Sequence, residues 1–103
     1  MRKNVWCLFV AIGITLVSGA SASAQEPFYK GKTIRIIVGL SPGGGYDTYS
    51  RLIARHMGRQ IPGNPTIIVE NMTGAASRIA ANHIYKVAKP DGLTIGHFLG
   101  TLF

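Results

Sequence analysis

Residues 33–47 read TIRIIVGLSPGGGYD, and this stretch decides the fold. It begins with Thr33 to Gly39, a β-branched apolar run of the length expected for a central parallel strand that is buried on both faces. A glycine-rich turn follows, and a helix is expected beyond it because the next side chains share one helical face at spacings of three and four. The residues on that face are Tyr49, Leu52, Ile53, His56, Met57 and Gln60. The helix is expected to stop by Pro62-Gly63.

The pattern then repeats along the chain. Thr66 to Glu70 is expected to be a second strand, Asn71 to Gly74 a turn, and Leu93 to Leu99 a third strand. Between the turn and the third strand, one helical face is marked by Ala76, Ile79, Ala80, His83, Ile84 and Val87. The order βαβαβ predicts an α/β fold with right-handed crossovers and a parallel sheet. Three strands and two helices leave a face or an edge bare, so we expect the chain to be part of a longer protein.

The amino-terminal residues have the form of a secretory signal. Arg2 and Lys3 precede an uncharged apolar run at residues 5–17, and Ala22-Ser23-Ala24 supplies a site for cleavage after Ala24. As a helix, the apolar run would span only about 20 Å, against roughly 30 Å of membrane hydrocarbon, which argues against a membrane anchor. We therefore expect residues 1–24 to be a signal peptide and the protein to be periplasmic.

Composition limits the classes of partner. Cleavage would remove two of the 11 basic side chains and none of the 4 acidic ones, which leaves a net charge of +5 and no cysteine. Disulfides and thiol chemistry are thereby excluded from the expected mature segment. The positive charge suits a small anionic ligand or an acidic cell surface. Nucleic acid is not expected, because no basic run is interleaved with aromatic residues.

The strongest local signal is the loop at residues 41–47, between the first strand and the first helix. Its glycines let the backbone approach a ligand, and the helix start offers free N–H groups, which together suit an anion. Asp47 could accept from those amides near the positive end of the helix dipole. The spacing fits neither a Walker loop nor the G-x-G-x-x-G fingerprint. The remaining alternative is a turn that only reverses the chain. The candidate ligand-binding residues are Ser41, Gly43, Gly44, Gly45, Tyr46 and Asp47.

The second strand-to-helix junction should lie at the same end of the sheet, where ligands of open α/β sheets bind. Its candidate residues are Thr73, Gly74, Ala75, Ala76 and Ser77. Thr73 and Ser77 offer hydroxyl groups, although Thr73 could equally serve as a helix cap. Arg78 could add a positive charge, but a solvated position is the preferred interpretation.

Three sequence segments resemble one receptor family: TIRIIVGLSPGGGYD, IIVENMTGAA and KPDGLTIG. The chain is similar to the amino-terminal part of the Bug, or tricarboxylate-binding, receptors of tripartite tricarboxylate transporters. The resemblance implies a periplasmic-binding-protein-like (type II) fold, of which residues 25–103 would be a partial first lobe. It also implies a small organic carboxylate ligand, held by the two loops described above, and membrane transporter subunits as partners of the complete protein. Met72-Thr73 and Ala76-Ser77-Arg78 depart from the family's usual Arg-Pro and Gly-Gly-Asn, which bears on ligand identity.

Other polar residues carry no chemistry of their own in this interpretation. Arg51, Arg55 and Arg59 recur every four residues opposite the apolar face, and we prefer a solvated surface to a partner-docking surface. The three histidines, His56, His83 and His97, lack metal-ligand spacing and are interpreted as structural. No nucleophile elbow or paired carboxylates are present, so no cofactor, metal or catalysis is expected.

Three functions remain open from the sequence. The first is a solute-binding receptor for a small organic anion. The second is an exported α/β enzyme that uses the first loop as an oxyanion or phosphate site, with its catalytic residues in further chain. The third is an inactive product of a truncated gene.

Overall fold

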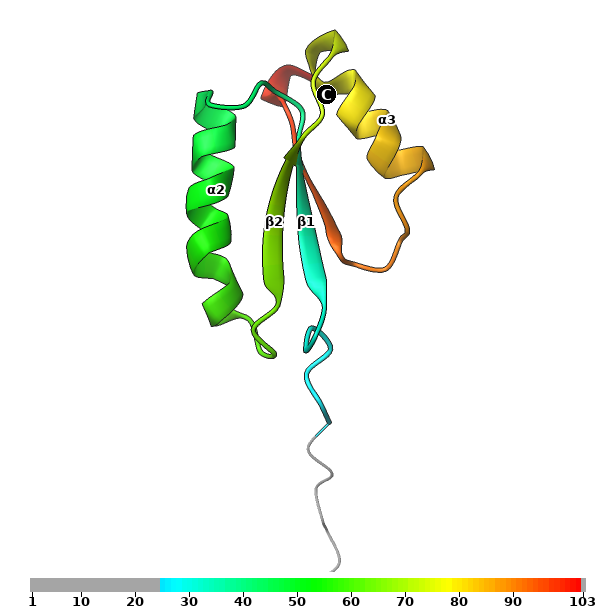
Figure 1. Ribbon diagram of the computed structural model, residues 1–103. Helices are drawn as coiled ribbons and strands as arrows, with labels where there is room; N and C mark the ends of the chain where they lie inside the picture. Colours follow the sequence, from blue (N-terminus) through cyan, green and yellow to red (C-terminus); the bar gives the residue numbers. More distant parts are fainter. Residues whose placement is uncertain (1–24, 103) are drawn as a thin grey trace, which may run out of the picture.

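A three-stranded parallel sheet carries a helix on each face (Figure 1). The structure is a computed structural model that describes residues 25–102; the signal peptide expected at residues 1–24 lies outside the described residues. The strands are β1 (Thr33–Val38), β2 (Thr66–Asn71) and β3 (Thr94–His97), in the spatial order β2-β1-β3. The predicted α/β fold with a central first strand is therefore confirmed.

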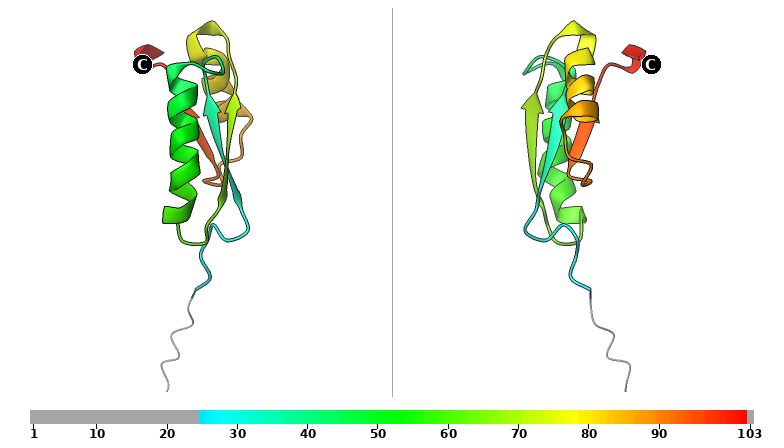
Figure 2. Two further views of the ribbon diagram at one scale, coloured as in Figure 1. Left: turned by 60° about the vertical axis from the view of Figure 1, so that its left-hand side comes forward. Right: turned by 90° about the vertical axis from the view of Figure 1, so that its right-hand side faces the viewer.

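The helices alternate with the strands. Helix α2 (Gly45–Met57) continues into a 3-10 turn, η1 (Gly58–Gln60), and α3 (Arg78–Lys86) follows the 3-10 turn η2 (Ala75–Ser77). A last 3-10 turn, η3 (Gly100–Leu102), follows β3. Because the chain moves from β1 to one neighbour and then back across β1 to the other, right-handed crossovers place α2 and α3 on opposite faces. Figure 2 shows the sheet between the two helices.

The core is centred on β1, the middle strand of the sheet. Residues in register point to the same face, and Ile36 lies between Val69 of β2 and Ile95 of β3. Ile37 and Val38 are almost completely buried. Among the residues that the structure describes, the buried hydrophobic ones are Ile34, Ile36, Ile37, Val38 and Ala80.

The prediction that β1 is buried along its whole length on both faces is wrong for its first half. Thr33 and Arg35 are exposed on the face that carries α3. Nη2 of Arg35 lies 2.6 Å from Oε2 of Glu70 on β2, and the hydrogen bond that the guanidinium donates to this carboxylate raises the pKa of Arg35. The short helix α3 leaves this part of the face to solvent, so a charged pair lies where a buried face was expected.

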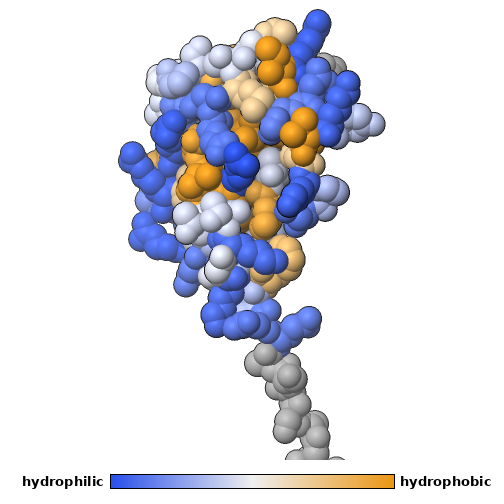
Figure 3. All heavy atoms as spheres, turned by 45° about the vertical axis from the view of Figure 1, so that its right-hand side comes forward, coloured by the Kyte–Doolittle hydropathy of each residue, from blue (hydrophilic) through white to orange (hydrophobic). Residues whose placement is uncertain are grey.

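Much apolar surface remains open on the described part of the chain, as the sequence predicted. The exposed large side chains are Phe28, Tyr49, Leu52, Ile53, Ile68, Ile79, Tyr85, Val87 and Ile95. A hollow of about 300 Å³ runs between α2 and β3, and Tyr49, Ile53 and Ile95 contribute to its wall. Apolar residues also come to the surface, in orange, on the side of the molecule seen in Figure 3. No helix among residues 25–102 has the length and apolar character needed to cross a membrane.

Candidate functional site

The carboxyl ends of the three strands meet at one edge of the sheet, together with the loops that follow them (Figure 1). The N–H of Gly39 donates to the carbonyl of His97 over 3.0 Å, and the N–H of Met72 donates to the carbonyl of Val38 over 2.8 Å. These bonds extend the sheet beyond its last ladder residues. Both predicted ligand-binding loops therefore start from a fixed framework at the same edge.

Asp47 is the buried anchor of the first loop. The residue is only 3 % exposed. Its carboxylate accepts a hydrogen bond from the N–H of Gly43 at 2.9 Å. Nε of Arg51, one helical turn later, donates to the same oxygen at 3.0 Å. The hydrogen bond from Arg51, aided by the one from Gly43, lowers the pKa of Asp47 to about 2. Asp47 is thus ionised and fully engaged within the protein. Its carboxylate bonds the loop amide of Gly43 and not, as expected, a free N–H of the helix start, and α2 has no side-chain cap.

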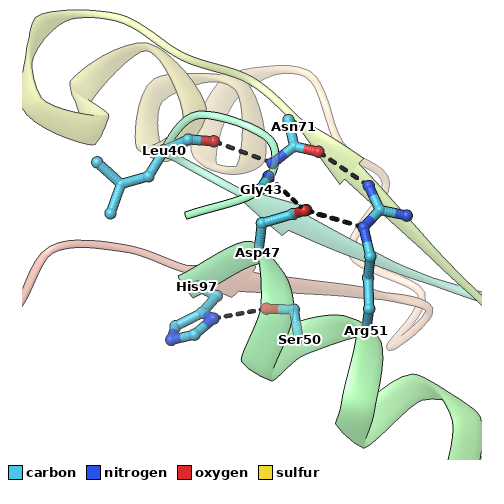
Figure 4. A network of polar contacts seen from close by, with 7 residues as sticks. All are labelled: Leu40, Gly43, Asp47, Ser50, Arg51, Asn71 and His97. Atoms are coloured by element: carbon cyan, nitrogen blue, oxygen red, sulfur yellow. Dashed lines mark hydrogen bonds and ion pairs between the residues drawn. The ribbon is translucent and has the colours of Figure 1, made fainter. Parts of the chain in front are cut away.

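Asn71, the last residue of β2, connects this anchor to the sheet (Figure 4). Its Nδ2 donates to the carbonyl of Leu40 at 3.0 Å, and its Oδ1 accepts from Nη2 of Arg51 at 3.2 Å. Arg51 is exposed, as the solvated-surface interpretation expects, but its guanidinium also bridges α2 and β2. The even spacing of the three arginines gave no signal of this, since the partner Asn71 comes from a distant part of the chain.

The glycine-rich loop needs glycine for its conformation at one position only. Gly43 has φ +80°, whereas Gly44 has φ −76° and ψ 175°, which is ordinary extended backbone. The N–H of Gly43 is taken by Asp47, and that of Gly44 points to the carbonyl of exposed Ser41 at 3.4 Å. Gly45 and Tyr46 begin α2, so their N–H groups have no acceptor within the helix, and none occurs elsewhere in the described residues. The N–H of Asp47, the third residue of α2, likewise has no acceptor in the described residues, so the helix start offers three main-chain donors.

The second junction is a left-handed run before α3. Gly74, Ala75, Ala76 and Ser77 all have positive φ, at 130°, 46°, 51° and 71°. The prediction that Ala76 belongs to the regular helix is therefore wrong, because α3 begins only at Arg78. Thr73 is exposed, and neither η2 nor α3 has a side-chain cap, so the capping alternative for Thr73 does not hold.

Ser77 is completely buried, and its hydroxyl is already used. It donates to the carbonyl of Gly39 at 3.2 Å and accepts from the N–H of Leu99 at 3.4 Å. A Cβ atom at position 39 would stand 2.5 Å from this oxygen, so glycine at 39 is required by the close approach of the two loops. Ser77 ties the ends of β1 and β3 together, and its hydroxyl is not the free group that the sequence suggested.

A second polar pair, missed by the sequence analysis, lies beside the first loop. The hydroxyl of Ser50 on α2 is 2.7 Å from Nδ1 of His97 at the end of β3. The ring of Tyr46 lies against the imidazole, with 4.8 Å between the ring centroids. Ser50 precedes Ile53 by three residues and Met57 by seven, so helical spacing could have placed its hydroxyl on the buried face.

All eleven predicted site residues therefore lie at or beside this edge, but they do not all offer free groups. The amides of Gly45 and Tyr46 are available, whereas the carboxylate of Asp47 and the hydroxyl of Ser77 are bonded within the protein. Among residues 25–102, no three His, Cys, Asp or Glu side chains come together in a way that could hold a metal ion. Chemically, the edge presents main-chain donors at a helix start, an arrangement suited to an anion.

Comparison with known proteins relates the chain to a receptor family. BugT of Bordetella pertussis is 32 % identical over 93 residues, which cover 89 % of this chain and 28 % of BugT. A UPF0065 protein in the TAR-I ttuE-ttuC′ intergenic region of Agrobacterium vitis is 31 % identical over 84 residues, which cover 82 % of this chain and 23 % of that protein.

The chain belongs to the Bug family. No family model matches it. This Bug-family chain spans about a quarter of the length of the two curated relatives, so it corresponds to one part of such a protein.

Proposed function

We propose that this chain forms part of a periplasmic receptor that captures a small organic carboxylate for a tripartite tricarboxylate-type transporter. The observation that carries the proposal is the pair of N–H groups of Gly45 and Tyr46 at the start of α2. They lie at the carboxyl edge of a parallel sheet, where the helix dipole favours a negative group. Membership of the Bug family supports the receptor class.

The charge balance of the loop supports an anionic ligand. Asp47 would repel a carboxylate at close range, but its charge is compensated by Arg51 and by the N–H of Gly43. The free amides at the start of α2 are then the groups left to meet the ligand. In this arrangement Asp47 orients the loop, and the second junction, residues 73–77, offers further main-chain donors beside it.

One substitution can remove a single donor without disturbing the helix. Gly45 is the first residue of α2, a position that tolerates proline, and Gly44 has the extended conformation that residues before proline prefer. A Cβ atom at Gly45 would meet nothing within 4 Å. Gly45→Pro therefore deletes one N–H, whereas Gly45→Ala keeps it and is the matched control.

The test is calorimetric titration of the purified exported protein with citrate, succinate and glutamate. We expect binding of at least one acid by the parent and by Gly45→Ala, and a loss of about tenfold or more in Gly45→Pro. Both variants should retain the circular dichroism spectrum of the parent. Equal binding by Gly45→Pro and Gly45→Ala would refute the site, and no binding of any acid by the parent would refute the receptor proposal for this chain.

The second candidate is an enzyme that uses the same amides for an oxyanion or a phosphate. It is favoured by the same helix start, since phosphate groups bind at such positions. Titration with inorganic phosphate separates the two functions. Phosphate binding that exceeds carboxylate binding, and that disappears in Gly45→Pro, would favour the enzyme.

A further inference from the structure

The Ser50–His97 pair fixes the chemistry of an imidazole beside the proposed ligand site. Ser50 is 1 % exposed, and Nδ1 of His97 is the hydrogen-bond partner of its hydroxyl among the described residues. A buried hydroxyl hydrogen that finds no acceptor is costly. In the neutral imidazole, the Ser50 hydroxyl therefore donates to Nδ1, which leaves the ring proton on Nε2.

The protonated imidazole leads to the same conclusion for Nε2. In that state Nδ1–H would donate to the Ser50 oxygen, and Nε2 would again carry a hydrogen. Nε2 lies on the side of the ring away from Ser50, and no partner for it occurs within residues 25–102 (Figure 4). His97 thus offers a hydrogen-bond donor in both charge states.

The ring lies beside the first turn of α2. The carbonyl of His97 accepts from the N–H of Gly39, where the first loop begins, and its imidazole packs against Tyr46, the second residue of α2. His97 as a residue is half-buried, and its contacts with Ser50 and Tyr46 restrict the ring. The imidazole is therefore held in one orientation by the Ser50 hydroxyl, by the Tyr46 ring and by the fixed end of β3.

We infer that His97 contacts the ligand, donating from Nε2 to an oxygen of the carboxylate held by the amides of Gly45 and Tyr46. Ser50 is then a positioning residue that selects the tautomer. This inference rests on the proposed function and replaces the purely structural interpretation of His97. It adds one side-chain donor to a site otherwise built from main-chain groups.

The tautomer can be measured without any ligand. We expect the ¹⁵N spectrum of histidine-labelled exported protein in alkaline buffer to show His97 with its hydrogen mainly on Nε2. Ser50→Ala should shift His97 toward a mixture of tautomers. The signals of His56, which lies on α2 like Ser50, should stay unchanged. A parent protein with the hydrogen mainly on Nδ1 of His97 would overturn the inference.

The contact is tested by titration with succinate and citrate. His97→Phe keeps a ring against Tyr46 but has no donor, and His97→Gln keeps an N–H donor. We expect His97→Phe to weaken binding about tenfold or more, and His97→Gln and Ser50→Ala by clearly smaller factors. Equal affinity of parent and His97→Phe would overturn the inference, as would equal losses in His97→Phe and His97→Gln.

The results also separate this inference from the proposed function. If Gly45→Pro loses the acid and His97→Phe does not, the receptor site stands and the histidine contact fails. If the parent binds no acid, both fail.

Discussion

The carboxylate of Asp47 and the guanidinium of Arg51 form an ion pair across one turn of α2, with Oδ2 and Nε 3.0 Å apart. The two partners differ sharply in exposure: the Asp47 side chain is 5 % exposed and the Arg51 side chain is 46 % exposed. The pair therefore places a compensated charge inside the first loop while its cation remains near solvent. Its other bonds, to Gly43 and Asn71, make it the point where loop, helix and sheet are joined.

Removing this anchor should loosen the first loop. Asp47→Ala loses the acceptor for the N–H of Gly43 and the partner of Arg51, and we expect the melting temperature to fall by about 4–8 °C. Asp47→Asn keeps an acceptor but no charge, so its fall should be smaller and its binding of a simple dicarboxylate close to that of the parent. Thr48→Ala, at an exposed neighbour, is the control in thermal unfolding. Unchanged stability and binding in both Asp47 variants would mean that the loop is only a turn.

The same ion pair predicts a dependence of stability on acid pH. The pKa of Asp47 in the folded protein is about 2, below its ordinary 3.8, because Arg51 and the N–H of Gly43 stabilise the carboxylate. Its contribution is therefore fully present above pH 4 and is lost as the pH falls towards 2. In thermal unfolding, the melting temperature of the parent should exceed that of Asp47→Asn at pH 5, and this difference should shrink as the pH falls to 2. A constant difference between the two proteins across this range would contradict the assignment.

Ala76 is a position where glycine should be better. Its φ of 51° lies in the left-handed region, which costs an L-residue about 1–2 kcal/mol and glycine very little. We expect Ala76→Gly to stabilise the protein by about 1 kcal/mol after the greater chain entropy of glycine is deducted. Ala81→Gly, inside α3, is the matched control and should destabilise by about 0.5–1 kcal/mol. Denaturant unfolding measures both, and destabilisation by Ala76→Gly would show that the left-handed run is not strained.

The buried hydroxyl of Ser77 should matter more than its size suggests. Ser77→Ala leaves the carbonyl of Gly39 and the N–H of Leu99 without their partner, at a cost of about 1–3 kcal/mol. Ser41→Ala, at an exposed serine of the first loop, should change the free energy of unfolding by less than about 0.5 kcal/mol. Urea titration of the parent and the two variants measures these free energies. Equal stability of Ser77→Ala and the parent would show that the Ser77 hydroxyl does not hold the two strand ends together.

Export should produce a shorter protein that begins at Gln25. The small-residue site Ala22-Ser23-Ala24 follows an apolar run too short to span a membrane, so cleavage after Ala24 is expected. Intact-mass analysis of the periplasmic fraction measures the new amino terminus. Recovery of the chain with Met1 in a membrane fraction would show that the segment is an anchor.

The sequence alone was enough to predict the order and type of the elements. The β-branched run of β1 and the helical spacing of Tyr49, Ile53 and Met57 are local patterns, and local patterns set strands and helices. Their alternation then restricts the topology to parallel strands with right-handed crossovers. The same logic located both loops at one edge, since parallel strands end on the same side.

Only the tertiary structure decided which groups at that edge are free. Arg51 bonds Asn71 and Ser50 bonds His97 because strands distant in sequence come beside α2, and no spacing within the helix encodes those partners. The left-handed run ending at Ser77 likewise depends on the close approach of Gly39, since the backbone there is held by a contact between loops. Secondary structure follows from neighbours along the chain, whereas the donors left for a ligand follow from neighbours in space.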